Sequence, residues 1–200
     1  MSYSHYDSDL QFSTFFDIIF YLLAGLCILQ ERLAWIVPIS IFTAFNRETS
    51  VLIPFLPITI ALFSSHKGSL RQTIPICFPA FMSYVAIFIG LRLIYGKQEL
   101  IVPYGYQPGF DLLLHNFSRI ITWVQLIATL SVIPIMALIG YQKWPLLLRG
   151  FFWIIVPILF VDHAFISVMV ESMLFLVPQA MVFIPGTLFL AQQSHVTVLK

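Results

Sequence analysis

The sequence has 200 residues, of which 60% are hydrophobic and 10% are charged, and its formal net charge is +1. Because soluble domains carry about 25% charged residues, this composition leaves too little polar surface for a water-soluble globule. The near-neutral charge balance also excludes nucleic acid as an implied partner. We therefore interpret the chain as an all-α, polytopic integral membrane protein whose first partner is the lipid bilayer.

The first apolar segments give one full membrane helix and then two short ones. A spanning helix needs about 20 apolar residues, and residues 10–29 supply them. No positively charged region precedes this segment as in a cleavable signal, so we expect it to remain in the mature protein. The next apolar stretch is too long for one span. The polar run Asn46-Arg47-Glu48 breaks it into a hairpin of helices 33–45 and 49–63. Asn46 is the expected N-cap of the second helix, and Glu48 is then expected in its first turn, where the helix dipole favours an acid.

Four further membrane helices are predicted along the rest of the chain. The connection 96–119 is the longest one, and its proline and glycine residues indicate turns. The sequence thus predicts a single membrane domain over residues 1–200 with about six or seven membrane helices, two of them short. The four later helices are expected at about 74–95, 120–140, 151–168 and 173–192.

The lysine and arginine distribution predicts that the N-terminus lies outside and the C-terminus in the cytoplasm. The inner loops then hold Arg32, Lys67, Arg71, Lys143, Arg149 and Lys200, and the outer side holds Arg47, Arg92, Lys97 and Arg119. In this orientation Trp35, Tyr141 and Trp144 mark the inner interface, while most acids and histidines gather on the outer side. Cys27 and Cys77 lie toward the reducing side, which indicates free thiols, and no cysteine spacing indicates zinc.

Arg47 and Glu48 are the strongest candidates for functional residues, because charged side chains near a bilayer need partners. Arg47 could bind a phosphate or carboxylate of a substrate through its planar, permanently charged fork, while Glu48 positions that ligand or accepts a proton. The structural alternative is an ion pair between Arg47 and an acid of another helix, with Glu171 as the first choice and Asp162 as the second. The two interpretations are compatible.

Other ionisable residues are weaker substrate-binding or catalytic candidates. Asp162 and His163 form an acid–imidazole neighbour pair that could shuttle protons, although adjacent helical residues point in different directions. Glu171 is either a site residue or simply an acid at a helix N-terminus. His115-Asn116 is weaker than these.

Asp7-Ser8-Asp9 has the form of a motif for a metal ion and a sugar phosphate, and a solvated acidic tail is the alternative. Beyond this tripeptide, no pattern supports a divalent metal, and none indicates another cofactor.

Three runs of residues resemble the middle of the GT-C type membrane glycosyltransferases, over roughly residues 6 to 190. They are Tyr6-Asp7, Phe45-Asn46-Arg47-Glu48-Thr49-Ser50 and Glu171-Ser172-Met173-Leu174-Phe175-Leu176-Val177-Pro178. In the third run, Met173 stands where those proteins usually have arginine. The resemblance implies an outward-facing active site and a polyprenyl-phosphate sugar donor, with Arg47 at the donor phosphate and Glu48 and Glu171 shaping the site.

The catalytic acid of that family usually lies in a large loop after a first membrane helix, and no such helix and loop precede residue 10 here. Either Asp7 or Asp9 is the remnant of that loop, or the catalytic half is absent. Enzymatic activity therefore stays open. The alternatives are a non-catalytic subunit or scaffold of a larger membrane partner and, third, a transporter, since broken short helices can line a substrate path.

Overall fold

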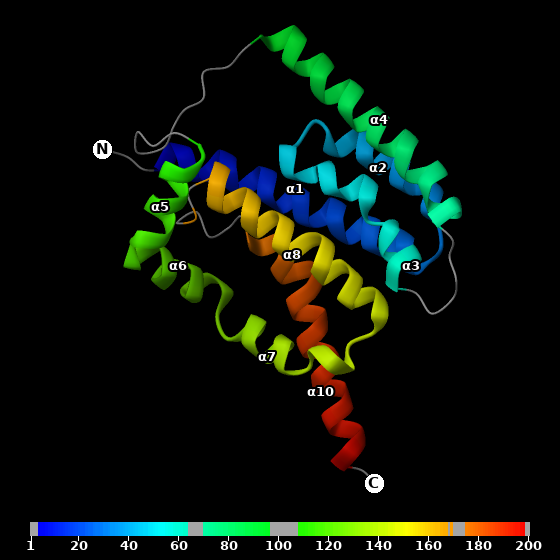
Figure 1. Ribbon diagram of the computed structural model, residues 1–200, viewed down its shortest axis with the longest axis vertical. Helices are drawn as coiled ribbons and strands as arrows, with labels where there is room; N and C mark the ends of the chain where they lie inside the picture. The colour runs from blue at the N-terminus through cyan, green and yellow to red at the C-terminus, as the bar shows by residue number, and fades with distance from the viewer. Residues whose placement is uncertain (1–3, 64–69, 97–107, 168, 170–174, 199–200) are drawn as a thin grey trace. The chain divides into compact units, whose positions relative to one another are not determined.

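The computed structural model describes residues 4–63, 70–96, 108–167, 169 and 175–198, with side chains from Phe12 to Gln192. The described residues form helices and turns without a strand, which confirms the all-α class. The chain divides into two compact units, Met1–Glu99 and Leu100–Lys200 (Figure 1). The single domain over residues 1–200 stays a prediction.

The first unit contains two long helices and a set of short ones between them. α2 contacts both long helices, α1 and α4, and also the 3₁₀ helix η2. The two long helices have 26 residues each, enough to cross a bilayer at 1.5 Å per residue. In order, the elements are α1 (Ser4–Leu29), η1 (Leu33–Trp35), α2 (Ile36–Thr43), η2 (Glu48–Phe55), α3 (Ile58–Phe63) and α4 (Leu70–Tyr95).

The predicted hairpin of helices 33–45 and 49–63 is wrong in its second arm. The chain does leave the helix at residues 44–47, but it then forms a 3₁₀ helix and a short α-helix instead of one membrane helix. Pro54 lies inside η2 and Pro57 follows it, and a proline lacks the N–H that a continuous α-helix requires. Asn46 is not the N-cap either, because Arg47 occupies that position in an extended conformation. Glu48 lies in the first turn, as predicted.

The second unit contains one long helix, α8, and shorter elements around it. The helix α5 lies in the connection where only turns were expected. It begins after Gly109, whose φ of +123° suits glycine and whose N–H donates to Phe165 O (2.8 Å). The elements are α5 (Phe110–Ser118), α6 (Ile120–Leu130), α7 (Ile133–Ile139), η4 (Tyr141–Lys143), α8 (Leu146–Ile166), α9 (Leu176–Pro178), the π-helix η6 (Gln179–Phe183) and α10 (Ile184–Val198).

The predicted helix 120–140 is broken into α6 and α7, which meet at a bend of 70°. Ser131 stands at the break with a φ of +57°. The carbonyls on either side accept hydrogen bonds from the last helices, Leu130 O from Gln179 Nε2 (3.2 Å) and Ile133 O from Thr187 Oγ1 (3.3 Å). These donors provide the hydrogen bonds that a broken helix needs inside a membrane.

The two ends of this bent pair lie near opposite ends of α8. Asn116, one turn before α6, bonds to carbonyls at the C-terminal end of α8. Tyr141, directly after α7, accepts a hydrogen bond from Trp153 in the N-terminal half of α8. We infer that α6 and α7 together form a broken membrane span that runs antiparallel to α8.

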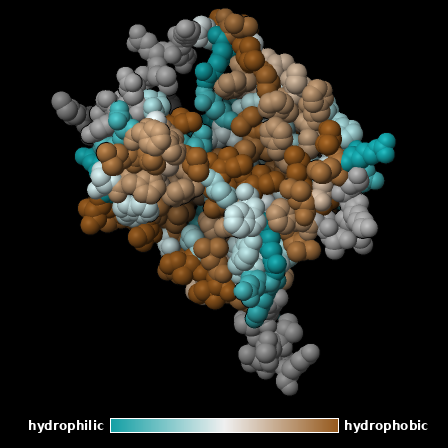
Figure 2. Space-filling view, in the orientation of Figure 1, coloured by the Kyte–Doolittle hydropathy of each residue, from teal (hydrophilic) through white to brown (hydrophobic). Residues whose placement is uncertain are grey.

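The described residues contain three helices that are long and apolar enough to cross a membrane, or four with the bent pair. The six or seven membrane helices of the prediction are therefore not found in this part of the chain, because prolines and the break at Ser131 divide the apolar stretches. Only 17% of the α4 segment is buried, so most of its apolar side chains are available to lipid. Figure 2 shows apolar residues spread widely over the visible surface. These are the features of an integral membrane protein; its orientation stays a prediction.

Candidate functional site

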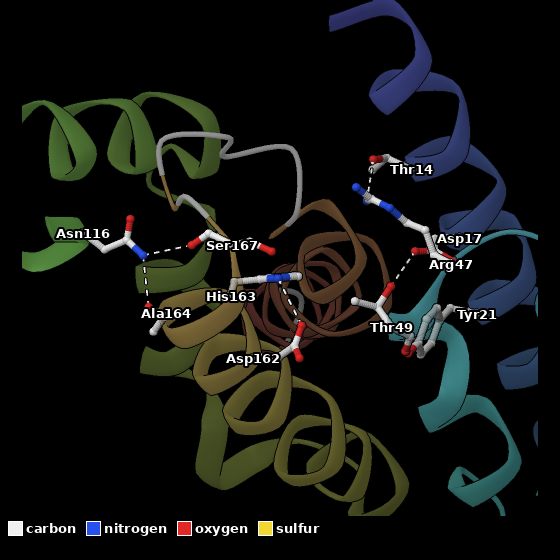
Figure 3. Close-up of polar contacts among 10 residues, drawn as sticks. All are labelled: Thr14, Asp17, Tyr21, Arg47, Thr49, Asn116, Asp162, His163, Ala164 and Ser167. Carbon is white, nitrogen blue, oxygen red and sulfur yellow. Dashed lines mark hydrogen bonds and ion pairs between the residues drawn. The ribbon is translucent and has the colours of Figure 1, made fainter. Parts of the chain in front are cut away.

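Asp17 is the centre of the polar site in the first unit. Its side chain lies on α1, is 2% exposed and accepts three hydrogen bonds from the turn before η2 and from the first residues of η2. The donors are Asn46 Nδ2 (2.8 Å), Thr49 Oγ1 (2.9 Å) and Ser50 Oγ (2.5 Å). Figure 3 shows Asp17 and Thr49 in contact. We call these four residues the Asp17 network; they join the polar turn to a membrane helix.

Two tyrosines hold the backbone of the same turn. Tyr21 of α1 donates to Thr49 O (2.7 Å). Tyr84 of α4 lies within hydrogen-bond distance of Arg47 O (2.9 Å) and Glu48 O (3.2 Å). Carbonyls that leave a helix need other donors when they are removed from water, and the two long helices supply these donors. The backbone at Arg47 is therefore fixed from two sides.

Arg47 projects from this fixed turn along α1. Its Nη1 donates to the buried Thr14 Oγ1 at 3.1 Å, as Figure 3 shows, and the residue is half-buried. Among the described residues, no carboxylate lies within ion-pair distance of its guanidinium. Of the two predicted partners, Glu171 lies outside the described residues and Asp162 belongs to the second unit. The predicted pairing stays a prediction.

Glu48 has a partner that the sequence did not indicate. It forms an ion pair with Arg92 of α4, and both side chains are mostly exposed. The guanidinium of Arg92 also lies over the ring of Phe88, 4.6 Å from its centroid. An exposed pair contributes only about 0–1 kcal/mol, so it leaves Glu48 accessible rather than locked in place.

Asn116 is the centre of a second buried network, in the second unit. It is 0% exposed, and its Nδ2 donates to Ala164 O (3.0 Å) and Ser167 O (2.9 Å). Its Oδ1 accepts from the N–H of Met169 (3.0 Å). The last carbonyls of a helix lack partners within the helix, and Asn116 provides donors for the end of α8. The role of Asn116 visible here is to fasten α5 to α8.

Asp162 and His163 approach each other although they are adjacent on α8. His163 Nδ1 lies 3.4 Å from Asp162 Oδ2, and the imidazole is 2% exposed while the carboxylate is 34% exposed. The imidazole also makes an edge-to-face contact with Phe175, with ring centroids 5.4 Å apart. A buried imidazole beside a more exposed acid has the components of a proton relay, as Figure 3 illustrates.

The remaining candidates lie elsewhere. Asp7 and Asp9 belong to the first turns of α1, and their side chains are outside the described set. His115 is buried in α5, and burial, followed by the nearby charge of Arg119, lowers its pKa. Within the described ranges no three His, Cys, Asp or Glu side chains come together as a metal site. Cys27 and Cys77 are free.

Asp17 is the functional residue that the sequence interpretation passed over. It is the one acid in the apolar segment 10–29, and an isolated acid in a membrane helix is by itself a signal of a polar partner. Tyr21 and Tyr84 carried no such signal, because an aromatic residue in an apolar helix resembles any other core residue. Which donors they meet depends on packing.

No family model matches the sequence, and no curated protein or solved structure matches the chain. The functional argument therefore rests on the chemistry of the described residues. In the first unit, that chemistry is the cationic side chain of Arg47 on a rigid turn. In the second unit, it is the pair of Asp162 and His163 near the end of α8 that Asn116 holds.

Proposed function

We propose that this multi-pass membrane protein binds the phosphate of a polyprenyl-phosphate sugar at Arg47, as part of a GT-C type glycosyltransferase. One observation carries the proposal. Arg47 is a half-buried residue on a rigid turn, and its Nη1 donates a hydrogen bond to the neutral hydroxyl of Thr14. A cation in that setting favours an anionic ligand, and arginine suits phosphate because its donors form a planar fork.

The rigidity of the turn supports binding as well as folding. Asp17 fixes Asn46 and Thr49 on either side of Arg47, and Tyr84 fixes the Arg47 carbonyl. A ligand that meets a preorganised group pays less entropy for ordering it. An arginine has five N–H donors, and within the described part of the chain Arg47 donates one side-chain hydrogen bond, to Thr14, so other donors can serve a phosphate.

The other predicted residues complete the proposal. Glu48, which follows Arg47 in the same unit, shapes the site around the sugar, and Asp7 or Asp9 supplies the acid that the resemblance implies. The roles of Glu171, Asp162 and His163 stay predictions from the sequence. In the predicted orientation, with the N-terminus outside, Arg47 lies on the outer side, which is where the resemblance implies the active site.

The direct test measures binding of polyprenyl monophosphate to the purified full chain in lipid nanodiscs. We expect Arg47→Gln to weaken binding about tenfold or more, because a hydrogen bond to a charged group contributes about 1.5–3 kcal/mol. The matched control is Arg32→Gln, which removes an exposed arginine of the same unit outside the Arg47 turn and should leave binding unchanged. Equal binding by wild type and Arg47→Gln would show that Arg47 is not the phosphate ligand.

A second measurement follows sugar transfer from the polyprenyl-phosphate donor in the same nanodiscs. We expect transfer by wild type and loss of transfer in Arg47→Gln. Phosphate binding without any transfer would reject the catalytic part of the proposal and retain the binding part.

A non-catalytic membrane subunit is the second candidate, and the two buried networks favour it. Asp17 and Asn116 are 2% and 0% exposed, and their hydrogen bonds go to this chain's own side chains and backbone. This is the arrangement of residues that hold a fold together. The subunit interpretation predicts co-purification with a larger membrane partner and unchanged function of Glu48→Gln. A monomer that transfers sugar without a partner would reject it.

A further inference from the structure

Basic and aromatic side chains gather at the beginning of α8. We call Tyr141, Lys143, Trp144, Arg149 and Trp153 the α8 entry cluster. Arg149 donates to Gln142 O, and its guanidinium lies 5.6 Å from the centroid of the Tyr141 ring. Trp153 Nε1 donates to Tyr141 Oη (2.8 Å), and the rings of Tyr141 and Trp144 are 5.3 Å apart. The cluster is thus a connected structure rather than a set of separate surface residues.

The cluster lies where a membrane span begins. α8 has 21 residues, which at 1.5 Å per residue roughly matches the ~30 Å hydrocarbon core. The first turn of α8 therefore belongs to the interface between lipid and water. Tryptophan and tyrosine are enriched at that depth because one part of the ring is apolar and another donates hydrogen bonds. The composition of the cluster fits this position.

Positive charge at this end of α8 has no compensation among the described residues. Neither Lys143 nor Arg149 belongs to an ion pair there, and Arg149 Nε is buried without a hydrogen-bond partner. The first turn of α8 contains no acid, and its N-cap, Pro145, makes no side-chain hydrogen bond. Free N–H groups at a helix N-terminus add a partial positive charge to that of the two cations.

We propose that the α8 entry cluster binds the headgroup phosphate of an anionic phospholipid. Lys143 and Arg149 contact the phosphate, and the accessible rings of Tyr141 and Trp153 fix the depth of the headgroup, while Trp144 is 2% exposed and packs beneath them. Leu146 and Trp153 are 45% and 54% exposed and two helical turns apart, so they provide an apolar face for an acyl chain. The charge distribution predicts this end of α8 in the cytoplasm, and the cytoplasmic leaflet is the one rich in anionic lipid.

The test titrates phosphatidylglycerol, with phosphatidylcholine as the neutral lipid, into the full chain in neutral detergent. Bound lipid is counted by native mass spectrometry, and the thermal midpoint is measured in parallel. We expect phosphatidylglycerol to bind and to raise the midpoint, and phosphatidylcholine to do neither. Lys143→Gln and Arg149→Gln should each weaken binding about fivefold, the effect of one basic residue near a charged lipid surface. The control Arg119→Gln removes an exposed cation of the same unit and should change nothing.

Several outcomes would overturn the proposal. Equal binding of the two lipids would show that the headgroup charge is not recognised. Equal stabilisation by inorganic phosphate would identify a site for free phosphate instead of a lipid. If Arg149→Gln fails to fold, the exposed Lys143→Gln decides alone: unchanged phosphatidylglycerol binding in that variant, or binding that is insensitive to added salt, rejects an electrostatic lipid site.

Discussion

The Asp17 network and the network around Asn116 both hold a place where helical backbone ends, but their central side chains have opposite hydrogen-bonding roles. Each has one nearly inaccessible polar side chain in apolar surroundings, and each fastens a place where helical backbone ends. Asp17 accepts hydrogen bonds from three side-chain donors of the turn. Asn116 instead donates to two carbonyls and accepts from one N–H.

The difference follows from what each place presents to its anchor. Asn46 in the turn before η2 and Thr49 and Ser50 at the start of η2 offer side-chain donors, and the two oxygens of the Asp17 carboxyl group accept them. The end of α8 offers carbonyl oxygens together with one N–H, and only an amide supplies donors and an acceptor at once. The lesson is that the identity of a buried polar residue is set by its partners more than by the membrane around it.

The largest effect is expected from Asp17→Ala. It removes the acceptor of the buried Ser50 and of the half-buried Asn46 and Thr49, and a stranded donor costs about 1–3 kcal/mol, so we expect a total loss of about 3 kcal/mol or more. Thermal unfolding of the detergent-solubilised protein measures the loss. Asp17→Asn should be milder, because its oxygen can keep two donors and the Thr49 hydroxyl can turn to accept.

The control for Asp17 is Asp111→Ala, an exposed acid in the first turn of α5. Surface substitutions of this kind usually stay within about 0.5 kcal/mol. Similar losses in Asp17→Ala and Asp111→Ala would contradict the central role of Asp17.

Asn116→Ala is expected to cost less than Asp17→Ala, about 2 kcal/mol. It strands the N–H of Met169, whereas the carbonyls of Ala164 and Ser167 tolerate the loss of a donor better than a buried N–H does. Asn116→Asp should be worse than Asn116→Ala, because a carboxylate would face two carbonyl oxygens. Thermal unfolding, with the exposed Gln142→Ala as control, ranks the three variants.

Asp17→Asn and Asn116→Asp together test whether the pattern of donors and acceptors decides which residue can occupy each network. If Asn116→Asp is as mild as Asp17→Asn, the donor and acceptor pattern does not decide the anchor, and the two networks are interchangeable.

Tyr84→Phe is the next effect in size. It removes the hydroxyl that lies 2.9 Å from Arg47 O and 3.2 Å from Glu48 O and keeps the ring in place, so we expect a loss of about 1 kcal/mol. The control is Tyr95→Phe, because Tyr95 is 73% exposed. A thermal midpoint that does not change in Tyr84→Phe would show that Asp17 and Tyr21 hold the turn without Tyr84.

The smallest expected effect is a pH dependence of the second unit. Burial, and then the charge of Arg119, lowers the pKa of His115 below its ordinary value, so the folded protein prefers the neutral imidazole. Its contribution is therefore fully present above the unfolded pKa of about 6.5 and is lost as the pH falls toward the folded pKa. The difference in thermal midpoint between about pH 7.5 and about pH 5.5 should shrink in His115→Gln. An identical difference in the variant would assign the pH dependence to other groups.

The sequence by itself determined the properties that depend on composition and local pattern. A charged fraction of 10% determined the membrane class, and the apolar run before Gln30 determined the end of the first helix. The break around Asn46 and the place of Glu48 in the next first turn were also predicted correctly. These features depend on residues a few positions apart, so they can be predicted from the local sequence.

Only the tertiary structure decided the number of spans and the partners of each polar group. The prolines near η2 and the bend at Ser131 turned predicted spans into short elements. Asp17 meets donors about 30 residues away, and Asn116 meets carbonyls about 50 residues away. Hydropathy is a property of a segment, whereas a hydrogen bond between distant segments exists only after helices have packed. That is why the sequence indicated a polar centre near Arg47 but did not name Asp17 as its anchor.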